Sequence, residues 1–313
     1  MTRTIALVGS PTALGGHFGG MERTPAALRG VGLIDRLTTR SALAASTLVD
    51  CGDAPNEPGW AADPDPRAKN RARICAYLPR LAEHVSAALA AAPGAALLAI
   101  GGDCTTHAGV MAGLRRAHVR GRGATGGPRL AVAWFDAHGD FNTPDTTPSG
   151  NVWGMPFAML LGRGEPDLVA ACDGPTAREE DAALLGGQVL DETESRLLAA
   201  SHVATFGAGM LGGPAGMAAL AAWAGTVAGR CEALYVAFDL DAVDAPEGLS
   251  LAMPEPGGMS LATAVQAVRV LAAAIPVAGF AATAAMERPE LDLGRTADAI
   301  ALLAEAALGA TAG

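Results

Sequence analysis

The sequence is poor in positive charge, in aromatic side chains and in long apolar runs, and these shortages exclude several classes of protein. It has 22 Lys and Arg against 32 Asp and Glu, a formal net charge of -10, and only 4% aromatic residues. Nucleic acids and anionic membranes are bound by clustered positive charge, so neither is expected as a partner. The one basic stretch, Arg115 to Arg129, lacks interleaved aromatic residues. We interpret it as a solvated helix end and loop.

Cysteine is also scarce and irregularly spaced. An odd, scattered set without a CxxC pair indicates reduced thiols rather than a disulfide framework. The N-terminal apolar run has about five residues and no internal run approaches the roughly 18 that a membrane span needs. We therefore expect a soluble, cytoplasmic protein. The five cysteines are Cys51, Cys75, Cys104, Cys172 and Cys231.

Half of the 313 residues are hydrophobic, and short apolar runs alternate with longer Ala-rich segments. Apolar strands separated by helices are typical of a parallel sheet covered on both faces. The sequence therefore predicts one three-layer α/β/α domain over residues 1–313 with a mainly parallel central sheet. The predicted strands are Ile5–Gly9, Thr47–Asp50, Ala96–Ile100, Leu130–Phe135, His202–Phe206, Ala233–Asp239 and Val277–Ala282. The predicted helices are Thr24–Leu33, Pro66–Ala92, Thr105–Arg116, Thr193–Ala200, Pro214–Arg230, Ser260–Ala274 and Thr296–Ala310.

Three polar clusters stand directly after apolar runs of this predicted sheet. They read GGDCTTH over residues 101–107, DAHGDFN over 136–142 and DLDAVD over 239–244. In open parallel sheets, ligands bind beyond the carboxyl ends of the strands. The three clusters are therefore expected to meet at one site.

Two of the clusters carry acidic residues at alternate positions. Alternate residues of an extended segment point the same way, so Asp136, His138 and Asp140 should converge, as should Asp239 and Asp241. Four carboxylates gathered there would repel one another unless divalent cations lay among them. Oxygen and imidazole ligands suit Mn²⁺ or a similar ion. A lone DxD is more often a turn or a helix cap, but two such clusters behind two core strands favour a metal site.

Two bridged metal ions would hold a shared water, lower its pKa and supply a hydroxide for attack on an electrophilic carbon. No Ser-His-Asp or catalytic-Cys arrangement competes with this hypothesis. The Gly-rich stretch GSPTALGGHFGG, residues 9–20, lacks the Lys-Ser/Thr ending of a phosphate loop. We expect it to be a flexible loop over the site, with His17 as a candidate substrate contact.

These motifs resemble those of the ureohydrolase family, which comprises arginases, agmatinases, formiminoglutamases and their relatives. The resemblance runs over most of the chain, and DAHxD followed by DxDxxD is its specific signature. The matching segments are GMERTPAALRGVGL (20–33), GGDC (101–104), DAHGDFNTPDTTPSGNVWGMPF (136–157), AFDLDAVDAPEG (237–248), MPEPGGMS (253–260) and AAMERPELD (284–292).

The resemblance implies an arginase-like fold and a small guanidino-type substrate. It also implies two divalent ions, Mn²⁺ above all, and assembly as a homo-trimer or homo-hexamer. Catalytic roles fall on Asp140 and on Glu287, which would pair with the substrate's guanidinium. The implied ligands are Asp136 and Asp239 for both ions, Asp140 and Cys104 for one, and His138 and Asp241 for the other. The other implied substrate-binding residues are Trp153 and a loop that resembles the one holding the α-carboxylate end in arginases, with Asn142, Ser149 and Asn151.

The sequence departs from the family pattern at three places. Cys104 replaces a metal-binding His; it is either a soft ligand that admits Zn²⁺, Fe²⁺ or Co²⁺, or a small buried hydrophobe. A thiolate ligand would also add negative charge and make the bound water less acidic. Trp153 replaces a His that serves proton transfer in arginases. The segment FGAGMLGG, residues 206–213, lacks the Asp expected to grip an α-amino group.

Cys in the GGDH position resembles the Nω-hydroxy-L-arginine hydrolases, which release hydroxyurea. This subtype is the favoured hypothesis, beside an arginine- or agmatine-like substrate that yields urea. One alternative is a formimino or other amidine hydrolase. Another is a catalytically degenerate ureohydrolase that acts as a binding or structural subunit.

Overall fold

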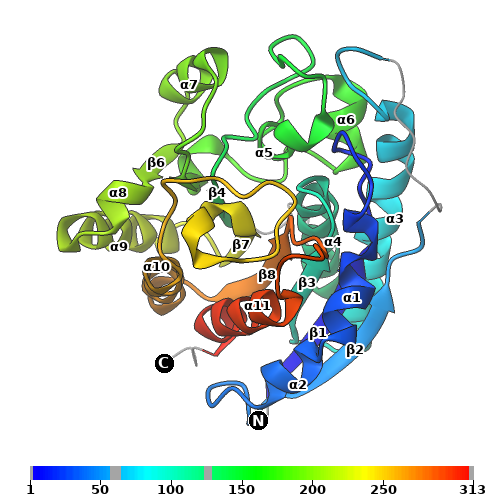
Figure 1. The fold of residues 1–313 in the computed structure, drawn as a ribbon, viewed down its shortest axis with the longest axis vertical. Helices are drawn as coiled ribbons and strands as arrows, with labels where there is room; N and C mark the ends of the chain where they lie inside the picture. Colours follow the sequence, from blue (N-terminus) through cyan, green and yellow to red (C-terminus); the bar gives the residue numbers. More distant parts are fainter. Residues whose placement is uncertain (1–2, 57–64, 123–128, 310–313) are drawn as a thin grey trace.

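The computed structural model describes residues 3–56, 65–122 and 129–309. Within these ranges all the strands join one parallel sheet, in the order β2-β1-β3-β8-β7-β4-β5-β6 (Figure 1). The predicted α/β class and mainly parallel sheet are therefore confirmed. The strands are β1 Thr4–Ser10, β2 Thr47–Asp53, β3 Ala96–Gly101, β4 Leu130–Asp136, β5 Ala182–Gly186, β6 Ala204–Gly207, β7 Ala233–Asp239 and β8 Val277–Thr283.

The central strands are apolar because both faces of the sheet are covered. Every residue of β3, β4 and β7 is buried, whereas the edge strand β2 is largely exposed. Parallel strands buried on both faces are expected to read as continuous apolar runs. This burial is the physical reason that the runs could be recognised in the sequence.

Helices cover the two faces in two groups, each with its own hydrophobic cluster. The first face is covered by α1 Thr24–Gly30, α2 Leu33–Thr38, α9 Pro214–Ala228, α10 Leu261–Ala274 and α11 Leu293–Leu308. The second face is covered by α3 Arg71–Ala91, α4 Thr105–Arg122, α5 Pro156–Leu160, α6 Pro166–Ala171 and α7 Glu192–Ala199. The short helix α8, Ala208–Leu211, follows β6.

Helices α3 and α4 pack closely because α4 presents glycines to its neighbour. A Cβ on Gly109 would lie 2.7 Å from Leu81 Cδ2, and one on Gly113 would lie 2.5 Å from Val85 Cβ. These two glycines stand four residues apart, so they share one face of the helix. The abundance of glycine thus has a packing role here.

Some predicted helix bounds are wrong. The helix predicted over Pro66–Ala92 begins only at Arg71, because Asn70 adopts a left-handed conformation with φ 59°. The helix predicted over Thr24–Leu33 ends at Gly30, before Gly32 at φ 80° starts α2.

The other bounds shift by a few residues, and one strand was not predicted. Helix α4 runs on to Arg122 rather than ending at Arg116, and residues 123–128 of the basic stretch lie outside the described ranges. Helix α11 begins at Leu293 rather than Thr296, and Ala310 also lies outside them. Strand β5, Ala182–Gly186, was missed. No helix among the described residues is both long and apolar enough to cross a membrane.

Candidate metal centre and substrate cavity

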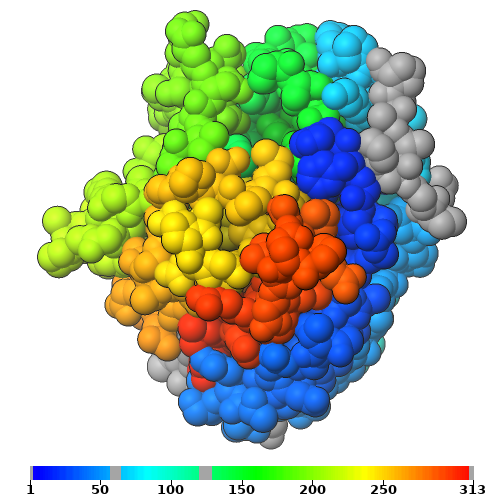
Figure 2. All heavy atoms as spheres, viewed as in Figure 1, coloured from blue at the N-terminus to red at the C-terminus, as the bar shows by residue number. Residues whose placement is uncertain are grey.

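The three polar clusters meet at the carboxyl ends of β3, β4 and β7. They line a cavity of about 370 Å³ together with residues of the 147–154 loop. Figure 2 shows a hollow on the surface where the dark blue N-terminal segment, the yellow segment and the green segment adjoin. The cavity lies where the topology of an open parallel sheet places a ligand.

Ligand-type atoms gather into two groups that share Asp136. Cys104, Asp136 and Asp239 form one group, and Asp136, His138 and Asp241 form the other. Within each group the ligand atoms lie within 4.8 Å of one another. All five side chains are buried apart from His138, which is half-buried. The sulfur, oxygen and imidazole donors present are those that divalent transition-metal ions take.

The convergence is achieved by turns rather than by extended chain. Strand β4 ends at Asp136 and β7 ends at Asp239, where a single 3-10 turn over Leu240–Ala242 begins. Asp140 has φ 48° in the left-handed region, which Asp tolerates better than most residues. The argument from alternate positions on extended segments therefore gave the right neighbours for the wrong geometric reason.

Hydrogen bonds orient the carboxylates of Asp239 and Asp136. Asp239 Oδ2 accepts from Cys104 Sγ at 2.9 Å and from Thr283 Oγ1 at 3.3 Å. Asp136 Oδ2 accepts from Trp134 Nε1 at 3.1 Å, and Asp136 Oδ1 accepts from the His138 amide at 2.7 Å. Trp134 and Thr283 are not members of the ligand groups, and outer partners of this kind orient the ligands of metal sites.

Burial makes the cluster bind protons tightly. Burial, followed by the charge of Asp241, raises the pKa of Asp239 to about 8. Burial, followed by the charge of Asp136, raises the pKa of Asp241 to about 6. Burial alone would lower the pKa of His138, but hydrogen bonds to Asp136 and Asp241 outweigh it and raise that pKa to about 12. Cations that displace these protons would relieve the repulsion among the carboxylates.

Asp140 supplies an independent test of whether the site fits a metal. Its side chain is buried and lines the cavity, yet its Oδ2 atom has no hydrogen-bond partner among the described residues. Burial and the charge of Asp136 raise its pKa well above the ordinary value. A buried carboxylate oxygen without a partner is costly, and a cation at this position would satisfy it.

Most of the substrate-binding residues expected from the resemblance lie on the cavity wall. Asn142, Ser149, Asn151 and Trp153 line it, as does His17, whose ring meets that of Trp153 edge-on at 5.1 Å. The 9–20 stretch is tied down here, because Trp153 N donates to Gly15 O at 3.0 Å. Glu287 differs: its side chain is exposed and is not among the described residues that line the cavity.

Two acidic residues of the cavity were missed in the sequence. Asp191 and Glu194 line it from the segment that follows β5. None of the described lining residues comes from 206–213, where the acidic segment had been sought. The sequence signal for these two residues was the apolar run Ala182–Gly186, followed by the acidic segment DETE at residues 191–194. Had that run been recognised as a strand, its carboxyl end would have pointed to Asp191.

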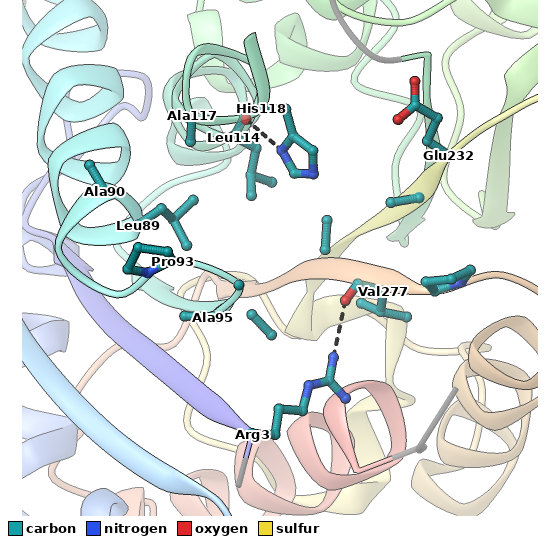
Figure 3. Close-up of a pocket in the computed structure, with 15 residues that line it drawn as sticks. Arg3, Leu89, Ala90, Pro93, Ala95, Leu114, Ala117, His118, Glu232 and Val277 are labelled. Atoms are coloured by element: carbon teal, nitrogen blue, oxygen red, sulfur yellow. Dashed lines mark hydrogen bonds between the residues drawn. The ribbon is translucent and has the colours of Figure 1, made fainter. Parts of the chain in front are cut away.

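A larger cavity, of about 630 Å³, lies at the opposite end of the strands (Figure 3). It is lined mainly by Ala, Leu, Val and Pro side chains at the starts of β3, β7 and β8. Arg3 Nη2 donates to Val277 O there, and His118 Nδ1 contacts Leu114 O at 2.9 Å. Among its described lining residues Glu232 is the only acid, so it lacks the convergent ligands of the smaller cavity.

Comparison with known proteins agrees with this geometry. The arginase family model matches residues 3–309. The chain is 30% identical to the arginase of Bacillus subtilis (strain 168) over 83% of this chain and 82% of that protein. The chain belongs to the arginase family. It is also 29% identical to the arginase of Bacillus caldovelox, over 87% of each chain.

The fold of this arginase-family chain also matches solved arginases. The solved native structure of Bacillus caldovelox arginase superposes with a TM-score of 0.84 at 27% identity, covering all of both chains. Arginase-family members are metal-dependent amidinohydrolases with a binuclear divalent metal centre. Among the described residues, the cluster around Asp136 has the donors for such a centre.

Proposed function

We propose that this arginase-family chain hydrolyses a C–N bond of a guanidino or hydroxyguanidino compound at a two-metal centre. The observation that carries the proposal is the convergence of five ligand-type side chains at one cavity, which four of them line. At about 370 Å³ the cavity has the size of a small-molecule site.

The two overlapping groups place Asp136 with both ions, Cys104 and Asp239 with one, and His138 and Asp241 with the other. From the resemblance to the family we further propose that Asp239 would contact both ions and that Asp140 would complete the site of Cys104. Two divalent ions supply, when bound, a water of lowered pKa and a clamp for the reacting oxygens. The protein's part is to hold the ligands without movement and to exclude bulk water from the cavity floor.

The pH dependence of metal binding follows from the pKa of the ligands. The folded protein holds protons on Asp241 to about pH 6 and on Asp239 to about pH 8, whereas the ordinary value is 3.8. The free energy of unfolding of the metal-free protein therefore falls as the pH rises through this window. Because fewer protons then compete with the metal ions, added metal should stabilise the protein more at higher pH. We expect the rise in Tm caused by Zn²⁺ or Mn²⁺ to be clearly larger at about pH 8 than at about pH 5.5. An equal rise at both values would contradict this protonation of the ligands.

Glu194 holds the loop that carries the ligands. Its Oε1 accepts from the Phe141 amide at 2.9 Å and from Asn142 Nδ2 at 3.4 Å. A Cβ on Gly139 would lie 2.5 Å from Glu194 Cδ, so the side chain lies directly against the loop. These contacts flank Asp140 on both sides.

Replacing Glu194 should therefore weaken metal binding. Glu194→Ala is expected to reduce metal affinity by about 10–100-fold, the range found for partners of metal ligands. Glu194→Gln keeps an acceptor oxygen and should lose less. Glu192→Ala is the matched control, because Glu192 lies in the same turn with its side chain 82% exposed. Metal titration followed by thermal shift would measure the affinities, and equal values for the Glu194→Ala and Glu192→Ala variants would contradict the role.

Within this reaction class we favour Nω-hydroxy-L-arginine as substrate and hydroxyurea as product. Cys104 and Trp153 support this choice, since both line the cavity and both depart from the arginase pattern. A hydroxyguanidine is less basic than a guanidine and has a different leaving group, so it needs a proton-transferring His less. Asp191 adds a carboxylate that suits an α-amino group, which removes the earlier objection to an amino-acid substrate.

A substrate panel would test the proposed function. The purified protein would be supplied with Mn²⁺, Zn²⁺, Fe²⁺ or Co²⁺ and given L-arginine, agmatine, Nω-hydroxy-L-arginine or a formimino amino acid. Urea, hydroxyurea or formamide among the products distinguishes the candidate reactions. Absence of turnover together with negligible bound metal would favour the non-catalytic subunit instead. We also propose homo-trimers or homo-hexamers, which sedimentation would test.

A further inference from the structure

The polar cluster at residues 101–107 ends in a histidine, His107, that the proposed reaction does not use. His107 lies in the first turn of α4 and is fully buried. Its ring nevertheless forms two hydrogen bonds: Nδ1 lies 2.8 Å from Tyr235 Oη, and Nε2 lies 3.0 Å from Thr283 Oγ1. Both partners are fully buried as well, and the Thr283 hydroxyl donates to Asp239 Oδ2. A buried histidine is therefore connected to a candidate metal ligand through a single hydroxyl group.

The direction of these hydrogen bonds follows from the hydrogens available. The Thr283 hydroxyl has one hydrogen, which it donates to Asp239 Oδ2 at 3.3 Å, so its oxygen accepts from His107 Nε2. Burial lowers the pKa of His107 to about 3, so the ring is neutral and carries its one N–H hydrogen on Nε2. The bare Nδ1 then accepts from the Tyr235 hydroxyl. Every hydrogen of this hydrogen-bond chain therefore points toward Asp239.

Aromatic side chains hold the His107 ring in this orientation. The ring meets that of Trp134 at a centroid distance of 4.9 Å and an interplanar angle of 70°, and that of Tyr235 at 6.0 Å. Trp134 Nε1 in turn donates to Asp136 Oδ2 at 3.1 Å. Trp134 and Thr283, which His107 contacts, are thus the outer partners of two carboxylates in the same ligand group.

The Thr283 hydroxyl gains importance when a metal ion binds. Cys104 Sγ also donates to Asp239 Oδ2, at 2.9 Å. A metal ion takes a cysteine as the thiolate, so this donor hydrogen is then lost. Among the described residues, the Thr283 hydroxyl is the side-chain donor that remains on Oδ2. Because a threonine hydroxyl can rotate, a fixed donor at its oxygen, here His107 Nε2, keeps its hydrogen directed at Oδ2.

We propose that His107 is a positioning residue of the metal centre: as a neutral Nε2–H donor it fixes the Thr283 hydroxyl, which in turn orients Asp239. Hydrogen-bond partners of this kind orient metal ligands, and loss of one typically lowers metal affinity by about 10–100-fold. The inference rests on the metal centre of the proposed function but not on the identity of the substrate. Metal affinity therefore tests it without any turnover.

Single substitutions give the first test. His107→Leu removes the ring nitrogens, and Thr283→Val removes the hydroxyl while keeping the shape. Each should weaken the binding of Zn²⁺ or Mn²⁺ by about 10–100-fold, measured on folded protein by competition with a chelator. His107→Gln keeps an acceptor for Tyr235 and a donor for Thr283, so it should bind metal nearly as tightly as wild type. Thr176→Val is the matched control, because Thr176 is also buried but its hydroxyl donates to Leu160 O.

A double variant distinguishes the hydrogen-bond chain from a merely structural role. If His107 acts through Thr283, adding His107→Leu to Thr283→Val should cause little further loss of affinity, because both changes break the same chain. A ring that only fills space would lower the affinity equally in both backgrounds. Tyr235→Phe removes only the hydrogen that sets the tautomer of His107 and should weaken metal binding to a smaller extent. If His107→Leu does not fold, Tyr235→Phe combined with Thr283→Val gives the same comparison.

The outcomes separate this inference from the proposed function. If wild type binds metal but hydrolyses no guanidino compound, and the variants show the expected affinities, the proposed reaction is wrong and the inference stands. Unchanged metal affinity in a folded His107→Leu variant of an active wild type would overturn the inference alone. Equal losses in His107→Leu and His107→Gln, or additive losses in the double variant, would also overturn it. A wild type that binds neither metal would overturn both.

Discussion

Asp136→Asn is expected to abolish tight binding of both metal ions and to reduce hydrolysis by more than about 100-fold. Asp136 is the one residue shared by the two ligand groups. Loss of a partner of a ligand already costs 10–100-fold in metal affinity or activity, so loss of a shared ligand should cost more. Metal analysis of the dialysed variant and turnover with saturating metal would measure the two effects.

The fold should survive this substitution, which makes the outcome interpretable. Asn has the shape of Asp and keeps one of the two oxygens that accept from Trp134 and the His138 amide, and removal of one buried acid relieves repulsion from Asp239. Asp298→Asn is a suitable control, because Asp298 is exposed and pairs with Arg36. A folded Asp136→Asn protein with two bound ions and full activity would refute the site assignment.

The sequence could predict the sheet and the ligands for one common reason. Strands β3, β4 and β7 are buried on both faces, so they are apolar throughout and end abruptly at polar residues. That contrast locates Cys104, Asp136 and Asp239 without any knowledge of side-chain direction. The prediction needed only the rule that parallel strands deliver their carboxyl ends to one edge.

The parts that could not be predicted depend on contacts between distant segments. The short strand β5 ends at Gly186, which has a positive φ like the following Gly187, and its Ala-rich run lacks a strong strand signal. Because β5 was not predicted, Asp191 and Glu194 were not recognised as residues of the cavity. Helix α3 begins after Asn70 and not at Pro66, and the Asn70 side chain is held there by a hydrogen bond to Leu14 in another segment. The spacing of apolar residues within the 66–92 segment cannot reveal a bond to another segment, so the prediction placed Lys69 in a helix.

Cys104→His is expected to shift the metal preference of the site toward Mn²⁺. The thiol of Cys104 is 2.9 Å from Asp239 Oδ2, and Cys104 lies in the first of the two ligand groups. A thiolate is a soft ligand that favours Zn²⁺, Fe²⁺ or Co²⁺, whereas an imidazole with carboxylates suits Mn²⁺. Cys104 borders the cavity, which leaves room for the larger ring. The affinity for Mn²⁺ should rise by at least about 10-fold, the lower end of the change produced by altering a ligand's partner.

The protonation of Cys104 adds a second expectation to the same experiment. Burial, followed by the charges of Asp239 and the other carboxylates, raises the pKa of the Cys104 thiol well above its usual value. Binding of a metal through sulfur must therefore expel a tightly held proton, while a neutral imidazole has none to lose. The Mn²⁺ affinity of Cys104→His should accordingly depend less on pH than that of wild type. Cys51→His, on the edge strand β2 and away from the cavity, should change neither quantity. Unchanged or weaker Mn²⁺ binding by a folded Cys104→His protein would show that Cys104 is a small buried side chain beside the metals and not a ligand.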